Sequence, residues 1–153
     1  MKPILCLDFD GVLHSYRSGW KGARRIPDPP VPGALEFVVG ALEQFRVAIL
    51  SSRSHQLFGR WAMKRWLRKH LIAEAGYDYS DTPRWWAERI GHTAFADPWN
   101  EEVRWAADCV VKEIEWPLFK PSAMVTIDDR ALNFTGVWPD VSDLRAFQPW
   151  NKR

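Results

Sequence analysis

Three short apolar runs stand out in the chain, and polar side chains follow each of them at once. The runs are Ile4–Leu7, Arg46–Leu50 and Ala123–Ile127. Runs this short, without a helical period, are typical of buried strands. Because ligands bind beyond the carboxyl ends of the strands in open α/β sheets, we expect the polar groups to share one crevice. These groups are Asp8-Phe9-Asp10, Ser51-Ser52-Arg53 and Asp128-Asp129-Arg130.

Helical patterns separate the runs. Apolar residues recur every three or four positions after Pro32-Gly33, which predicts a helix that packs on the sheet. Ser54 is a suitable N-cap for a longer helix that reaches about Leu71. Weaker patterns predict a short helix that ends at Ile90 and another at residues 98–111.

Two more strands are expected, one at Ile114–Phe119 and one at the edge of the sheet at Leu144–Trp150. The sequence therefore predicts an α/β fold, a single three-layer Rossmann-like domain over residues 1–153. Its mostly parallel sheet would have about five strands, with helices on both faces. Residues 12–32 would form a flap loop and residues 76–112 a variable helical insertion, with no room for a large cap.

Composition adds further constraints. The length of 153 residues suits one domain, and the net charge of +2 favours no class of partner. Cys6 and Cys109 lie in apolar contexts without metal spacing, as expected of thiols in a reducing compartment. The N-terminal apolar run is too short for a signal peptide or a membrane span, so we expect a cytoplasmic protein. Ten Trp exceed the needs of a small core, so some should line a cleft or a contact surface.

The loop at residues 12–32 leaves the predicted sheet beside Asp8 and Asp10. Its glycines and prolines predict no regular element. It carries Arg17, Trp20 and other basic and aromatic side chains, which suit a flap over a phosphorylated substrate. A solvated linker with scattered charges is the alternative.

Asp8 and Asp10 can point into the same crevice, because Gly11 lets the backbone bend sharply after them. Two carboxylates this close raise each other's pKa, so the pair either shares a proton or holds a cation. A strand followed by a solvated turn is the simpler alternative. The other strand ends decide between the two.

The Asp-x-Asp-Gly run, the strand that ends at Ser51, the Lys-Pro at Lys120 and the strand that ends at Asp128-Asp129 occur in this order. Together they resemble the haloacid dehalogenase (HAD) superfamily of phosphohydrolases, over nearly the whole chain. The resemblance implies a Mg²⁺-dependent phosphatase that forms an aspartyl phosphate on Asp8. Asp10 would be the general acid and base, a role that needs the raised pKa that crowding by Asp8 provides.

The same resemblance implies oxygen ligands for Mg²⁺. The Asp8 carboxylate, the main-chain carbonyl of Asp10 and the Asp128 carboxylate would bind the ion. Asp129 would bind it directly or support its waters.

Two further catalytic groups are implied by the resemblance. Ser51, with Ser52 as the fallback, matches a residue that hydrogen-bonds a phosphoryl oxygen, although a plain turn or cap is the alternative. Lys120 matches the lysine that pairs with nucleophile and phosphate. Lys120 lies only three positions before the start of the last predicted strand, so Lys112 remains a rival.

Substrate-binding residues are expected around the nucleophile. Arg53 and Arg130 flank the site in sequence, and they would either bind substrate or form surface ion pairs. A site without a large cap is open, which favours a bulky phosphate ester, and the basic, Trp-rich surroundings point to a nucleotide or nucleic-acid end. The expected substrate-binding residues are Gly11, Arg17, Trp20, Ser52, Arg53 and Arg130.

Two alternatives to a phosphatase stay open, and the order of the motifs decides against a third. A phosphotransferase of the same superfamily would need a cap to exclude water. A non-catalytic HAD-like binding module would be expected to have lost an acid. A response-regulator receiver carries its phosphorylated aspartate on a middle strand, which the order of motifs here does not match. The sequence does not predict an oligomeric state.

Overall fold

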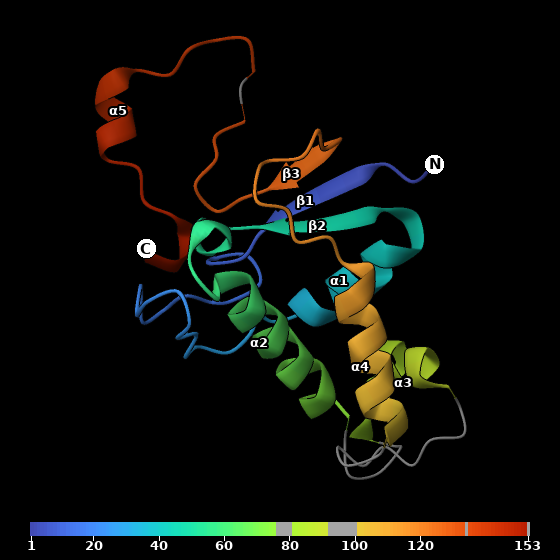
Figure 1. The fold of residues 1–153 in the computed structure, drawn as a ribbon. Coiled ribbons are helices and arrows are strands. Elements are labelled where there is room, and N and C mark those ends of the chain that lie inside the picture. Colours follow the sequence, from blue (N-terminus) through green and yellow to red (C-terminus); the bar gives the residue numbers. More distant parts are fainter. Residues whose placement is uncertain (76–80, 92–100, 134, 153) are drawn as a thin grey trace.

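A computed structural model describes residues 1–75, 81–91, 101–133 and 135–152, and it has an α/β architecture (Figure 1). Three parallel strands form a small open sheet in the order β2-β1-β3. In chain order the elements are β1 (Ile4–Asp8), α1 (Ala34–Gln44), β2 (Arg46–Leu50), the 3₁₀ helix η1 (Ser52–His55), α2 (Gly59–Ala73), α3 (Arg84–Ile90), α4 (Glu101–Glu113), β3 (Val125–Ile127), α5 (Val141–Arg145) and the 3₁₀ helix η3 (Trp150–Lys152).

The central strand β1 sorts its side chains between two faces. Successive residues of a strand point to opposite sides of the sheet. Leu5 and Leu7 belong to the hydrophobic core, whereas Cys6 and Asp8 line a pocket on the other side. The alternation therefore places the Asp8 carboxylate outside the core, at the carboxyl end of the strand.

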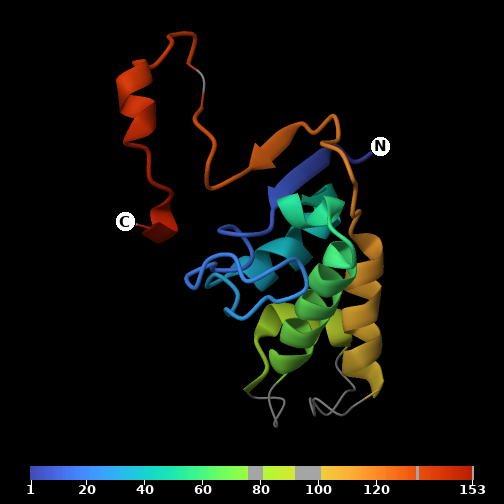
Figure 2. The same cartoon turned by 60° about the vertical axis from the view of Figure 1, so that its left-hand side comes forward.

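Helices α1 to α4 lie on the same side of the sheet in both views (Figures 1 and 2). Their buried side chains form one cluster with those of β1 and β2. On its other face the sheet offers Cys6, Asp8, Ala48 and Leu50, which is too little apolar area for a second helical layer. The expected three-layer arrangement, with helices on both faces, is not confirmed.

The segment that joins α4 to β3 crosses this second face (Figure 1). The strand predicted at Ile114–Phe119 is reduced to a bridge, in which Glu115 donates to the Val47 carbonyl and accepts from the Ile49 amide. Pro117 has no N–H to continue the pairing. The expectation of about five strands is not confirmed in the part of the chain that the structure describes.

The prediction of a strand at Leu144–Trp150 is wrong. Its residues belong to the end of α5, an irregular stretch and the start of η3. The Trp150 indole N–H donates to the Gly11 carbonyl at 2.7 Å. This contact holds the end of the tail beside the loop after β1, away from the edge of the sheet.

The helix predicted from Ser54 starts later than expected. Ser51, not Ser54, is the N-cap of η1, and α2 begins only at Gly59. Phe58 separates the two with a left-handed backbone, at a φ of 62°. The other predicted helices are confirmed as α1, α3 and α4, although the expected start of α4 at Pro98 lies outside the described residues.

The insertion predicted at residues 76–112 contains α3 and most of α4. These helices contact each other, and α4 also contacts α2. They lie under the sheet and not over the carboxyl ends of the strands (Figure 2). In the described residues no helix is both long and apolar enough to span a membrane.

Removing a core side chain tests this packing. Leu67 on α2 is fully buried in the cluster, so Leu67→Ala should lower the free energy of unfolding by about 2–5 kcal/mol. Leu57, which is 79 % exposed, provides the matched control, and Leu57→Ala should change the free energy of unfolding by less than about 0.5 kcal/mol. Urea unfolding followed by circular dichroism measures both. Equal losses would contradict the core described here.

Candidate active site at the carboxyl end of the sheet

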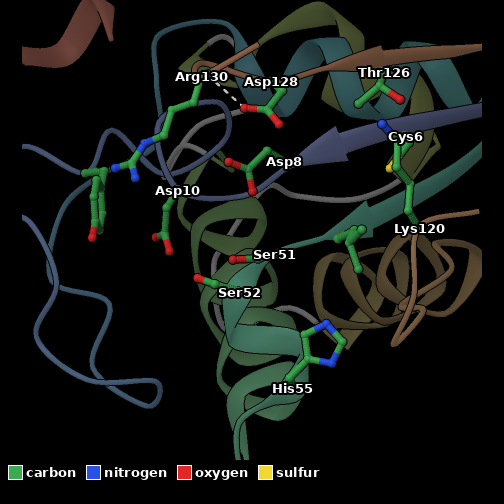
Figure 3. A pocket seen from close by; sticks show the side chains of 12 residues that line it. Cys6, Asp8, Asp10, Ser51, Ser52, His55, Lys120, Thr126, Asp128 and Arg130 are labelled. Carbon is green, nitrogen blue, oxygen red and sulfur yellow. Dashed lines mark hydrogen bonds between the residues drawn. The ribbon is translucent and has the colours of Figure 1, made fainter. Parts of the chain in front are cut away.

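A pocket of about 380 Å³ opens at the carboxyl ends of the strands (Figure 3). Side chains from β1, β2, η1 and the residues after β3 line it. Asp8 lies between Asp128 on one side and Ser51 on the other (Figure 3). The expectation that the strand ends share one crevice is confirmed in this respect. The charged and polar lining residues are Asp8, Asp10, Tyr16, Ser51, Ser52, His55, Lys120, Thr126, Asp128 and Arg130.

Asp8 is the carboxylate most affected by its surroundings. Burial raises its pKa to about 7, and the neighbouring carboxylates of Asp128, Asp129 and Asp10 act in the same direction. The Phe9 amide donates to Asp8 Oδ1 at 2.7 Å and opposes the shift. This hydrogen bond also holds the side chain in place, with the second oxygen left for chemistry.

Asp8, Asp128 and Asp129 form a compact cluster. One carboxylate oxygen from each lies within 4.8 Å of the others. The Asp128 carboxylate accepts a hydrogen bond from the Arg130 amide at 2.8 Å, in a tight turn after β3. Because β1 and β3 are neighbours and parallel, their carboxyl ends bring these residues together from positions far apart in the chain.

Asp129 is packed against the turn after β1. A Cβ on Gly11 would lie 2.3 Å from Asp129 Oδ2, and Gly11 has a φ of +92°. A larger residue at Gly11 would therefore be strained and would also displace the carboxylate. This is the physical role of Gly11 in the Asp-x-Asp-Gly run.

The cluster suits a hard divalent cation. The Asp129 side chain is completely buried, yet its two oxygens have no hydrogen-bond partner among the described residues. The Arg130 guanidinium is 3.9 Å away, and burial raises the Asp129 pKa. A buried carboxylate without a hydrogen-bond partner is costly, and a cation held by Asp8, Asp128 and Asp129 would reduce that cost.

Asp10 points away from this cluster, toward two donors. The Arg53 Nε donates to Asp10 Oδ2 and the His14 Nδ1 lies against Oδ1, both at 2.8 Å. The Asp28 amide donates to His14 Nε2 at 3.2 Å, so His14 carries its proton on Nδ1 and donates it to Asp10. Both oxygens of the Asp10 side chain are therefore engaged by neighbouring side chains.

Arg53 is fully buried, so it does not form the surface ion pair that the sequence left open as an alternative. Besides its pair with Asp10, its Nη1 donates to the carbonyls of Gly22 and Ala23 at 2.7 and 3.0 Å. Its guanidinium also lies 4.6 Å from the centre of the Trp20 ring. Arg53 and Trp20, both expected to bind substrate, therefore hold the loop at residues 12–32 against Asp10, and the linker alternative does not describe this loop.

The structure distinguishes the candidate lysines and serines by position. Lys120 lines the pocket, whereas Lys112 is exposed in the last turn of α4. Ser51 is buried, and its Oγ accepts a hydrogen bond from the Arg53 amide at 3.3 Å. The hydroxyl proton of Ser51 is therefore available to a group in the pocket. Ser52 is exposed at the rim.

The remaining expected residues lie at the entrance. Arg130 lines the pocket beside Tyr16, with its guanidinium 6.0 Å from the Tyr16 ring. Burial is also the main reason that the pKa of Tyr16 is raised. Arg17 is exposed and is not among the lining residues, but the Lys152 ammonium donates to its carbonyl at 3.4 Å.

Sequence reasoning missed several residues of this site. His14 and Asp28 orient Asp10, and a histidine four positions after Asp10 was a signal that could have been used. Tyr16 and His55 line the pocket without any motif. Trp150 reaches the site from the other end of the chain through its bond to Gly11, and nothing in the local sequence predicts this contact.

The chain matches no family model, no curated protein and no solved structure. The geometry of the pocket and the resemblance of the motifs are therefore what point to a function.

The raised pKa of Asp8 gives a test on metal-free protein. The folded-state pKa of about 7 exceeds the ordinary value of 3.8, so ionisation of Asp8 costs more in the folded state. The free energy of unfolding should fall as pH rises from about 4 to 7, by up to about 4 kcal/mol from this group. Asp8→Asn should therefore be more stable than wild type near pH 8, with the gain vanishing near pH 4.

Urea unfolding in EDTA across this pH range measures the effect. Asp143→Asn on the exposed helix α5 is the control for the loss of a surface carboxylate. A gain for Asp8→Asn that is the same at both ends of the range would contradict the assignment.

Proposed function

We propose that the protein is a HAD-like, Mg²⁺-dependent phosphomonoester hydrolase that forms an aspartyl phosphate on Asp8. The observation that carries the proposal is the carboxylate cluster of Asp8, Asp128 and Asp129 at neighbouring strand ends, in one pocket with Lys120 and Ser51. A Rossmann-like fold of the HAD type is part of the proposal, supported by the parallel β2-β1-β3 order and the order of the motifs.

The residues divide the work of phosphoryl transfer among them. Asp8, Asp128 and Asp129 would hold Mg²⁺, which when bound neutralises negative charge between the nucleophile and the phosphoryl oxygens. Lys120 contributes a positive charge to the same pocket. Ser51 donates its hydroxyl proton to a phosphoryl oxygen, and its buried position at the N-cap of η1 fixes where that donor lies.

In the first step an Asp8 carboxylate oxygen attacks phosphorus and the bond to the ester oxygen breaks. Asp10 gives its proton to the leaving alkoxide. In the second step water attacks the phosphorus of the aspartyl phosphate and gives a proton to Asp10. Inorganic phosphate leaves, and the Asp8 carboxylate is regenerated.

Arg53 and His14 position Asp10 for both steps. Each binds one oxygen of the carboxyl group, so its direction is set from two sides. The open pocket lets water reach the intermediate, which favours a hydrolase over a phosphotransferase.

Hydrolysis of an aryl phosphate tests the nucleophile. Wild type with Mg²⁺ should release phosphate, and Asp8→Asn should lower kcat by on the order of 10³-fold or more. Removal of divalent ions with EDTA should abolish the reaction, and added Mg²⁺ should restore it. Asp143→Asn is again the matched control and should keep wild-type rates. Activity that survives in Asp8→Asn would contradict the proposal.

The leaving group tests Asp10 separately. General acid catalysis contributes about 10²- to 10⁴-fold, and most when the leaving oxygen is strongly basic. Asp10→Asn should therefore slow hydrolysis of an alkyl phosphate at least tenfold more than hydrolysis of a nitrophenyl phosphate. Equal losses on both esters would assign Asp10 a structural role and not that of the acid.

A further inference from the structure

An exposed apolar surface adjoins the pocket and has no part in the mechanism above. Leu57 and Phe119 are 79 % and 76 % exposed, and Phe58 and Trp61 are each 54 % exposed. Large apolar side chains gathered in this way usually mark a binding site. We call this surface the aromatic strip: Leu57, Phe58, Trp61, Leu118 and Phe119.

The strip is continuous with the active-site pocket. His55 lines the pocket and also lines a hollow formed with Leu57, Phe58 and Trp61. In Figure 3 His55 lies beyond Ser51 and Ser52, on the side away from Asp128. Its ring is 5.7 Å from that of Phe119. A ligand whose phosphate reaches Asp8 can therefore extend over His55 onto the strip.

Phe58 is held in a strained backbone conformation. Its φ of 62° and ψ of 5° lie in the left-handed region, which is rare for a bulky side chain. The next residue, Gly59, packs so closely on Arg53 that a Cβ there would lie 1.9 Å from the Arg53 carbonyl oxygen. Strain of this kind persists where the surrounding structure imposes it, and it is concentrated at functional sites. Here it holds an aromatic ring in solvent.

The charged residues that line the hollows along the strip are all basic. The Arg24 guanidinium lies 5.9 Å from the centre of the Phe58 ring, and that of Arg65 lies 5.3 Å from the Trp61 ring. A second hollow shares Gln56 and Leu57 with the first and is lined by Lys21, Arg24 and Arg25. None of the described residues lining these two hollows is acidic. Aromatic rings alternate here with cations, the arrangement that binds single-stranded nucleic acid.

We propose that the aromatic strip binds the single-stranded nucleic-acid part of a substrate whose terminal phosphate is hydrolysed at Asp8. This inference rests on the proposed function of the pocket. Bases stack on Phe58 and Trp61, and Arg24 and Arg65 contact the backbone phosphates. A protein partner would match these cations only through acidic side chains placed between apolar ones, whereas a nucleic-acid strand carries a negative charge beside every base, so the strip fits this polyanion better.

Two measurements on wild type and Trp61→Ala test the proposal. The first is the binding of a fluorescein-labelled decathymidylate without a terminal phosphate, followed by anisotropy. Trp61→Ala should raise its Kd about tenfold, the loss expected for one stacked base. The second is the ratio of kcat/KM for the same strand with a 3′- or a 5′-phosphate to kcat/KM for an aryl phosphate. This ratio should also fall about tenfold, with one of the two ends preferred.

The matched control is Trp105→Ala. Trp105 is 69 % exposed on α4 and lines neither of the two hollows. This variant should keep the wild-type Kd and the wild-type ratio. Arg65→Gln should weaken binding and reduce the slope of log Kd against log salt concentration by about one, because it removes a phosphate contact.

The outcomes separate the two proposals. Aryl phosphate hydrolysis in wild type, together with decathymidylate binding that is absent or insensitive to Trp61→Ala, would overturn the strip and leave the phosphatase. Binding that depends on Trp61 in a protein without any phosphatase activity would overturn the reaction and support the strip. Loss of a dimer in Trp61→Ala, without any binding of the oligonucleotide, would mean that the strip is a protein interface.

Discussion

Most of the site depends on the contacts of one buried group, the guanidinium of Arg53. It pairs with Asp10, bonds to the carbonyls of the loop after β1, and stacks against Trp20. Its own backbone carbonyl lies against Gly59, where the strained turn at Phe58 ends. Losing one partner of a buried ion pair typically costs about 3–5 kcal/mol. The side chain of Arg53 therefore joins Asp10 to the loop, and its backbone carbonyl connects both to the turn at Phe58.

The carboxylate cluster acts in the opposite direction. Asp8, Asp128 and Asp129 repel one another, and burial adds to the cost of the charges on Asp8 and Asp129. The packing of α1 to α4 against one face of the sheet provides the stability that tolerates this cost. A divalent cation would offset this repulsion, and most of all at Asp129, whose oxygens accept no hydrogen bond among the described residues.

Much of the central architecture can be predicted from local sequence. The strands β1 and β2 follow from their apolar runs, and the gathering of Asp8, Asp10 and Asp128 follows from the rule for strand ends. The helix α1 follows from its periodicity. These features depend on residues close together in the chain, or on a general property of parallel sheets.

Other features depend on contacts that no local pattern contains. Arg53 reads as a surface cation until its bond to Asp10, 43 residues away, is known. The break at Phe58 follows from the close approach of Gly59 to Arg53, since the sequence there reads as a continuous helix. The tail was expected to form a strand, but Trp150 binds Gly11 across 139 residues and leads the chain elsewhere.

The short strand β3 separates the stability of the site from that of the fold. Its residues Val125–Ile127 are exposed, and within the sheet it pairs with β1 alone. Its loss would leave the helical core intact but would carry Asp128 and Asp129 away from Asp8. Local opening of such an edge requires less free energy than global unfolding. A cation bound between β1 and β3 would stabilise their pairing. Its binding would then slow hydrogen exchange of the β3 amides, even in the absence of substrate.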